Sequence, residues 1–135
     1  MKHLYTLRIP RHTLCRFPVQ IEMHCFCDAS QSAYAACIYL RSVDRQGNVI
    51  VRLQCAKARV ASVKPTTIPR LELCACLLGA QLADALCRAL RCVIQRRMSW
   101  TDSSIALTWL ASRYDKLETF VANRVGTILR THSSV

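Results

Sequence analysis

Ile21–Asp28, with the sequence IEMHCFCD, opens a series of three strand-like runs that decides the fold class. Its apolar and polar residues alternate, which is typical of a β-strand with one buried face. Ala33–Arg41 (AYAACIYLR) and Val49–Ala56 (VIVRLQCA) follow, and both are rich in aromatic or β-branched residues. The turn between these two runs ends in Gly47 and Asn48, which tolerate positive φ. The three runs predict an antiparallel meander.

The apolar period then changes from two residues to that of a helix. After a basic loop expected at residues 57–66, Thr67 can cap a helix that has Pro69 in its first turn, and helical spacing continues to Ala89. A short strand and two amphipathic helices complete the pattern, at Arg97–Thr101, Ser103–Ser112 and Leu117–Arg130. The expected order is βββαβαα, which indicates an α/β fold with a mixed sheet.

Length and composition indicate one domain with a substantial core. The chain has 135 residues, of which 52% are hydrophobic. No apolar run approaches the roughly 20 residues of a membrane-spanning helix, and the first residues do not resemble a secretory signal. We therefore expect a soluble, intracellular protein, cytoplasmic or nuclear, with no membrane partner.

The charge favours a polyanionic partner. Lys and Arg number 19 against 8 Asp and Glu, which gives a formal net charge of +11. Nucleic acid is the commonest partner of so basic a domain. A basic protein without a nucleic-acid role is the competing interpretation.

The nine cysteines favour packing over metal binding. Cys25 and Cys27, like Cys74 and Cys76, are separated by one residue, which suits neither a zinc knuckle nor a redox pair. Alternation sends Cys25 and Cys27 to one face of a strand, where they act as small hydrophobes. We expect free thiols, and we expect Gly79 to permit close packing of the long helix.

Three of the eight acids lie at the ends of predicted elements. Asp28 ends the first strand, Glu72 lies near the start of the long helix, and Asp102 follows the short strand. Each has an ordinary explanation: a turn residue for Asp28, a response to the helix dipole for Glu72, and a helix cap for Asp102. Together they predict a carboxylate cluster at one edge of the sheet.

Several motifs occur in the order found in one known family. They are FCDAS at Phe26–Ser30, followed by Ala33-Tyr34; AKARVA at Ala56–Ala61; IPRLEL at Ile68–Leu73; WTDS at Trp100–Ser103; and FVANRV at Phe120–Val125. This series resembles the ribonuclease H region of BEL/Pao retrotransposon polyproteins. Arg8-Ile9-Pro10-Arg11 resembles the segment that joins the reverse transcriptase to that region. The resemblance implies a lead-in at residues 1–20 from an upstream reverse transcriptase-like region and a ribonuclease H-like domain at residues 21–135.

The resemblance also implies an activity. The Asp–Glu–Asp order matches type 1 ribonucleases H, which hydrolyse the RNA strand of RNA–DNA hybrids with two Mg²⁺ ions. Asp28, Glu72 and Asp102 would be the catalytic residues and metal ligands, with Asp28 shared by both ions. Six basic residues are the expected nucleic-acid contacts: Lys57, Arg59, Arg70, Arg96, Arg97 and Arg124. The resemblance assigns no chemistry to Asn123.

The family pattern continues with a further strand and a helix carrying a fourth acid, whereas this sequence stops at Val135. We therefore expect a ribonuclease H-like fold without its last strand and helix. Three hypotheses follow: a Mg²⁺-dependent ribonuclease H, a catalytically dead remnant that still binds nucleic acid, and an interaction module with no nucleic-acid role. Arginines scattered over the surface, away from the acids, would favour the third.

Overall fold

The structure is a computed structural model that describes residues 11–133, apart from the side chains of Tyr114, His132 and Ser133. The first ten residues of the predicted lead-in lie outside this range. The strands are β1 (Gln20–Ala29), β2 (Ala33–Val43), β3 (Val49–Val60) and β4 (Arg96–Trp100). The helices are α1 (Ile68–Ala89), α2 (Ser104–Ala111), the 3₁₀ turn η2 (Tyr114–Lys116) and α3 (Thr119–Ser133). The predicted order βββαβαα is confirmed.

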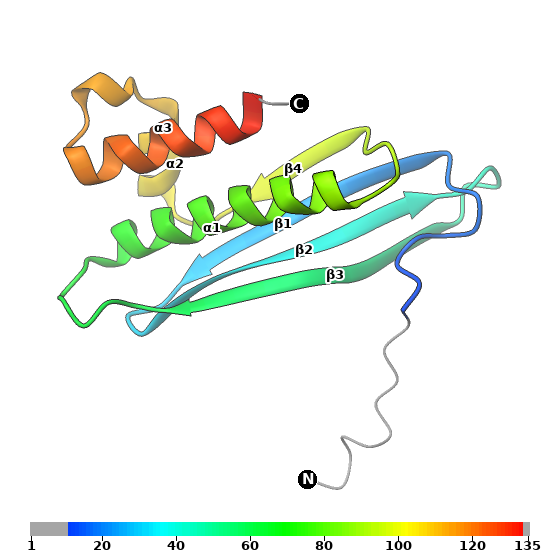
Figure 1. Ribbon diagram of the computed structural model, residues 1–135, viewed down its shortest axis with the longest axis horizontal. Coiled ribbons are helices and arrows are strands. Elements are labelled where there is room, and N and C mark those ends of the chain that lie inside the picture. Colours follow the sequence, from blue (N-terminus) through cyan, green and yellow to red (C-terminus); the bar gives the residue numbers. More distant parts are fainter. Residues whose placement is uncertain (1–10, 134–135) are drawn as a thin grey trace, which may run out of the picture.

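The strands form one mixed sheet in the order β3-β2-β1-β4 (Figure 1). β1, β2 and β3 pair antiparallel, as the meander predicts, and β4 pairs parallel to β1. The prediction of a basic loop at residues 57–66 is wrong for residues 57–60, because β3 continues to Val60. The start of β2 supplies partners for this extension: Ala33 lies opposite Val60, and Tyr34 lies opposite Arg59.

The hairpin between β2 and β3 depends on one glycine and one aspartate. Gly47 has φ 84°, as expected, but Asn48 does not adopt positive φ. The Asn48 backbone N–H and side-chain amide instead donate to the Asp44 carboxylate, both at 2.9 Å. Asp44 therefore fixes the turn, a role that the sequence analysis did not give it.

Helix α1 lies along one face of the sheet and carries α3 on its outer side (Figure 1). The inner core joins Met23, Cys25, Ile38 and Leu40 of the sheet to the helix, and the outer core joins α1 to α3. The outer cluster consists of Leu73, Ala80, Val121, Val125 and Ile128. Helix α1 is therefore buried on two sides, and this explains its 22 residues of mostly apolar sequence.

Gly79 and the cysteines meet where α1 approaches the sheet. A Cβ atom at residue 79 would lie 2.5 Å from Cys27 Sγ and 2.8 Å from Cys25 Sγ. Both cysteines are buried, and all nine thiols are free. The expectation of close packing at Gly79 is confirmed, as is the common face of Cys25 and Cys27.

The opposite face of the sheet is not covered by any helix of the described residues (Figure 1). Large apolar side chains are exposed there, namely Phe26, Val49, Val51, Leu53 and Trp100. Within residues 11–133, no helix has the length and apolar character needed to cross a membrane.

Candidate active site

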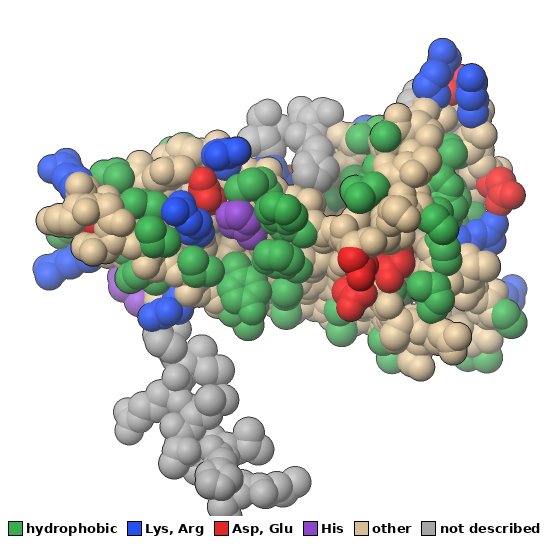
Figure 2. All heavy atoms as spheres, turned by 180° about the vertical axis from the view of Figure 1, so that it is seen from behind, with side chains coloured by type: hydrophobic (Ala, Val, Ile, Leu, Met, Phe, Trp, Pro, Cys, Tyr) green, Lys and Arg blue, Asp and Glu red, His purple; other side chains and the backbone are tan. Residues whose placement is uncertain are grey.

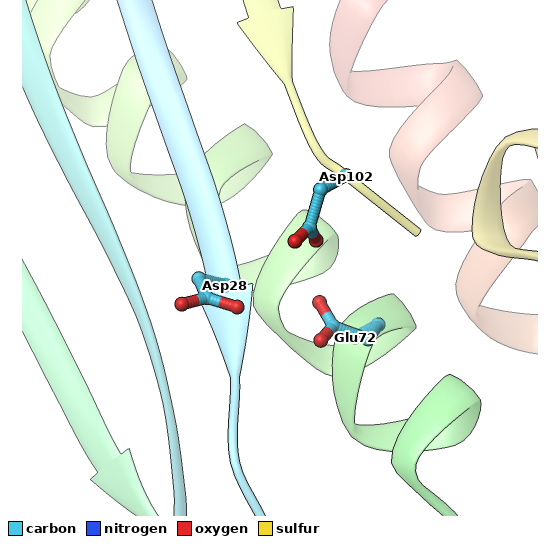
Figure 3. A group of neighbouring side chains, drawn as sticks. All are labelled: Asp28, Glu72 and Asp102. Carbon is cyan, nitrogen blue, oxygen red and sulfur yellow. The ribbon is translucent and has the colours of Figure 1, made fainter. Parts of the chain in front are cut away.

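Three carboxylates converge where β1, α1 and the segment after β4 meet. Figure 3 shows Asp28, Glu72 and Asp102 pointing toward one another from these three places. One oxygen from each residue lies within 4.8 Å of the other two. The predicted cluster at the sheet edge is therefore confirmed as geometry. It forms because β1 and β4 run parallel, so that both strands end at the same edge.

The surroundings of the three acids differ. Asp28 and Asp102 are exposed, whereas Glu72 is buried. Burial raises the pKa of Glu72, and the negative charges of Asp28 and Asp102 raise it further. Glu72 Oε2 is inaccessible to solvent and has no hydrogen-bond partner among the described residues. A buried oxygen without a hydrogen-bond partner destabilises the folded state unless a cation or a hydrogen-bond donor binds it.

The ordinary explanations account only in part for these acids. Ser103, not Asp102, is the N-cap of α2, because its hydroxyl accepts from the Ala106 N–H at 3.2 Å. The helix dipole acts most strongly in the first turn of α1, and Glu72 lies beyond that turn. Asp28 does accept the Ala29 N–H at 2.8 Å, as a turn residue would, but one of its oxygens remains within reach of the cluster.

The cluster fits a hard divalent cation. Its donors are carboxylate oxygens, which Mg²⁺ prefers. Among the described residues, no Lys, Arg or His forms an ion pair with any of the three acids. Mutually repelling carboxylates without a basic partner are best neutralised by a metal ion.

A hollow of about 730 Å³ opens beside the acids. Asp28 and Asp102 line it together with Phe26, Trp100 and Lys57. Figure 2 shows the corresponding face, on which acidic side chains form a compact group. A ligand in this hollow would therefore contact two of the acids directly.

The family of the chain follows from a comparison with known families. A family model described as a Pao retrotransposon-like RNaseH-like domain matches residues 1–103. The chain belongs to this family. The matched range includes all three acids, and the observed mixed sheet with its helices agrees with a ribonuclease H-like fold. A search among curated proteins found no match.

The basic residues expected to contact nucleic acid are dispersed over this ribonuclease H-like domain. Lys57 is the only one of the six that lines the hollow beside the acids. Arg59 is exposed on β3, and Arg96 is exposed on β4 with its Nη1 atom 4.0 Å from Glu22 Oε1. Partly buried Arg97 has two guanidinium nitrogens that lack partners within the described residues. This dispersion is the arrangement that the interaction-module hypothesis anticipates.

Arg70 and Arg124 take part in internal contacts. Arg70 forms a 2.6 Å ion pair with Glu118, and its guanidinium lies 5.0 Å from the Phe120 ring centroid. Arg124 lies over the same ring at 3.5 Å and donates to the Phe120 carbonyl. Two of the family motifs thus join α1 to α3. The nucleic-acid role expected for these two arginines stays a prediction.

Two aromatic side chains line the same hollow as the acids and were not predicted to belong to the site. Phe26 precedes Asp28 by two residues, and Trp100 precedes Asp102 by two. The alternation of a strand places residues two apart on the same face. This two-residue spacing is the sequence signal for the position of the two rings near the acids.

Proposed function

We propose that this domain hydrolyses the RNA strand of RNA–DNA hybrids with Mg²⁺, as part of a retrotransposon polyprotein. The observation that carries the proposal is the convergence of three carboxylates, which have no basic partner within residues 11–133, beside an open hollow. Asp28, Glu72 and Asp102 would hold the metal. When bound, divalent ions supply an activated water and stabilise the leaving oxygen of a phosphodiester.

The residues around the metal have distinct roles in this proposal. Glu72 is buried, and one of its carboxylate oxygens lies within 4.8 Å of an oxygen of each of the other two acids. Exposed Asp28 and Asp102 line the hollow in which the scissile phosphate would lie. Lys57, on the same hollow, supplies a positive charge for the phosphate.

The test is cleavage of an end-labelled RNA–DNA hybrid by the purified chain, with Mg²⁺ and with EDTA. Loss of an outer-shell partner of a metal site typically costs about 10- to 100-fold in activity or affinity. Loss of a ligand itself, in Asp28→Asn or Asp102→Asn, should therefore reduce the rate by at least about 100-fold. Asp115→Asn is the matched control, because Asp115 is exposed, pairs with Arg113 and lies outside the cluster.

Cleavage by the Asp28→Asn and Asp102→Asn variants at the wild-type rate would refute the assignment.

A second candidate is binding of nucleic acid without cleavage. The cluster that could hold a metal ion in residues 11–133 contains three acids, whereas the family pattern implies a fourth. Binding alone predicts retention of the hybrid at low salt, affinity that falls steeply as salt rises, and no product. The same cleavage assay, run beside a binding titration, separates this candidate from the first.

A further inference from the structure

Helix α1 begins without a side-chain cap, although its second turn carries Glu72. Thr67 is the N-cap residue, but its side chain makes no capping hydrogen bond among the described residues. Thr67 and Pro69 line a hollow of about 580 Å³, so the first turn is not packed on that side. The first N–H groups of a helix have no partner within the helix, and helix ends fray. The position of the start of α1 must therefore depend on contacts with the rest of the fold.

Helix α3 supplies such contacts through Phe120. The guanidinium carbon of Arg70 lies 5.0 Å from the centroid of the Phe120 ring, and that of Arg124 lies 3.5 Å from the same centroid. Arg124 also donates to the Phe120 carbonyl at 3.1 Å, and its Nε is buried without a hydrogen-bond partner among the described residues. A cation binds an aromatic ring more strongly when it is shielded from water. We call Arg70, Phe120 and Arg124 the clamp.

The ion pair of Arg70 with Glu118 is the weaker contact at this junction. The two charged groups lie 2.6 Å apart, but the Glu118 side chain is 76% exposed and that of Arg70 is 38% exposed. Water and salt screen so exposed a pair, and such pairs add little to stability. Phe120, in contrast, is partly buried against the outer core. The orientation of Arg70 therefore depends mainly on the ring.

The clamp and the outer core hold one side of α1, and Glu72 leaves the helix on another. Arg70 and Leu73 are three residues apart, so they lie on one side of the helix. Leu73 is fully buried in the outer core that joins α1 to α3. Glu72, between them in sequence, points instead toward the other two acids (Figure 3). Contacts with α3 thus fix the rotation of α1 about its axis at the residue that faces the cluster.

A small rotation of α1 would displace the Glu72 carboxylate from the cluster. Side chains reach about 5–6 Å from the axis of a helix, so a rotation of about 10° moves their ends by about 1 Å. Mg²⁺ demands near-ideal geometry, with oxygen distances of about 2.1 Å. Distances in real metal sites stay within about 0.2 Å of such values. Slight freedom at the start of α1 is therefore enough to weaken metal binding.

We propose that the clamp of Arg70, Phe120 and Arg124 positions Glu72 for the metal ion. The inference rests on the proposed function for the presence of that ion. It gives Arg70 and Arg124 a role inside the protein, in place of the nucleic-acid contact that the resemblance implies. Phe120 is a positioning residue, because it lies outside the acid cluster and acts through the rotation of α1.

The test is the affinity of the free protein for Mg²⁺, measured from the rise of Tm with Mg²⁺ concentration in the absence of nucleic acid. Phe120→Leu keeps an apolar side chain but removes the π face. Loss of a residue that orients a metal ligand typically weakens metal binding by about 10- to 100-fold, and we expect about 10-fold for Phe120→Leu. Phe120→Tyr keeps the ring and should bind Mg²⁺ like the wild type.

Two controls separate positioning from a general loss of stability. Ile128→Val removes a methylene group from the outer core and lowers Tm without changing the clamp. Glu118→Gln removes only the ion pair. Both variants should keep the wild-type affinity for Mg²⁺. If the clamp residues served only to contact nucleic acid, Phe120→Leu would keep that affinity too, since no nucleic acid is present.

A second measurement follows the start of α1 without metal. In EDTA, the amide hydrogens of Leu71, Glu72 and Leu73 should exchange several-fold faster in Phe120→Leu than in the wild type, after correction for the difference in global stability. In Ile128→Val, the same correction should remove any difference from the wild type. This measurement detects loosening of the helix start directly and does not depend on the proposed hydrolysis.

Equal Mg²⁺ affinity in Phe120→Leu and the wild type would overturn the proposal, and so would unchanged amide exchange at the start of α1. An equal loss of Mg²⁺ affinity in Ile128→Val would also overturn it, because any loss of stability would then suffice. Hybrid cleavage is scored separately. A wild type that binds Mg²⁺ without cleaving would reject only the hydrolysis, whereas cleavage by a wild type that Phe120→Leu matches in Mg²⁺ affinity would reject only the clamp. No Mg²⁺ response in the wild type would reject both.

Discussion

Replacing Glu72 by Gln should stabilise the metal-free protein and remove its response to Mg²⁺. At 4.8 Å, the limit of the oxygen separations in the cluster, two unit charges repel by about 3.5 kcal/mol at an effective dielectric of about 20 and by about 0.9 kcal/mol in bulk water. Because Asp28 and Asp102 are exposed, each repulsion lies nearer the lower value. Two such repulsions, less the cost of a buried amide N–H, leave a net gain of about 1 kcal/mol. For a domain of this size, that gain raises Tm by about 3–5 °C.

The assay is thermal unfolding in EDTA and in increasing Mg²⁺. Wild type should gain about 2.7 kcal/mol when Mg²⁺ exceeds its dissociation constant 100-fold, and Glu72→Gln should gain little at the same concentration. Glu118→Gln makes the same chemical change at an exposed ion pair with Arg70. This control should lose no more than about 1 kcal/mol and keep the full Mg²⁺ response. A Glu72→Gln variant that is less stable in EDTA and responds to Mg²⁺ like the wild type would refute the reasoning.

Two further predictions concern the core and the uncovered face. Gly79→Ala should destabilise the chain in urea unfolding, because its Cβ would lie 2.5 Å from Cys27 Sγ; overpacking costs about 1–3 kcal/mol, against a helix-propensity gain of about 1 kcal/mol. A Cβ atom at residue 126 would lie 3.4 Å from Arg130 Nη1, so Gly126→Ala should leave the free energy of unfolding unchanged or raise it. A greater loss of stability in Gly126→Ala than in Gly79→Ala would contradict this account. Burial would raise the pKa of Glu22, but the His24 hydrogen bond and the charge of Arg41 outweigh it and lower that pKa. The wild type should therefore exceed Glu22→Gln in stability at pH 7 and lose this advantage as the pH falls below about 4, near the unfolded-state pKa; a constant difference from pH 7 to pH 3 would contradict the shift.

Local patterns predicted the elements of this fold well, because each depends on neighbouring residues. Alternation placed Cys25 and Cys27 on the buried face of β1, and Thr67 and Pro69 marked the start of α1. The end of β3 was missed for a physical reason. Residues 57–60 are basic and exposed, and they become strand only because β2 begins at Ala33 and offers partners to them.

The site was predictable only in part, for the same reason. Each acid has a local explanation, and only the parallel pairing of β1 with β4 brings Asp28 and Asp102 to one edge. Arg70 shows the opposite case, since no local pattern indicates that it pairs with Glu118, 48 residues away.

The pairing of β1 with β4 explains why the acids converge. In register, Phe26 of β1 lies opposite Trp100 of β4. Asp28 lies two residues beyond Phe26 within β1, and Asp102 lies two residues beyond Trp100 in the segment after β4. The parallel pairing therefore brings both carboxylates to one edge of the sheet, where Glu72 of α1 meets them. A substitution that shifts this register should separate Asp28 from Asp102 and weaken the response of Tm to Mg²⁺.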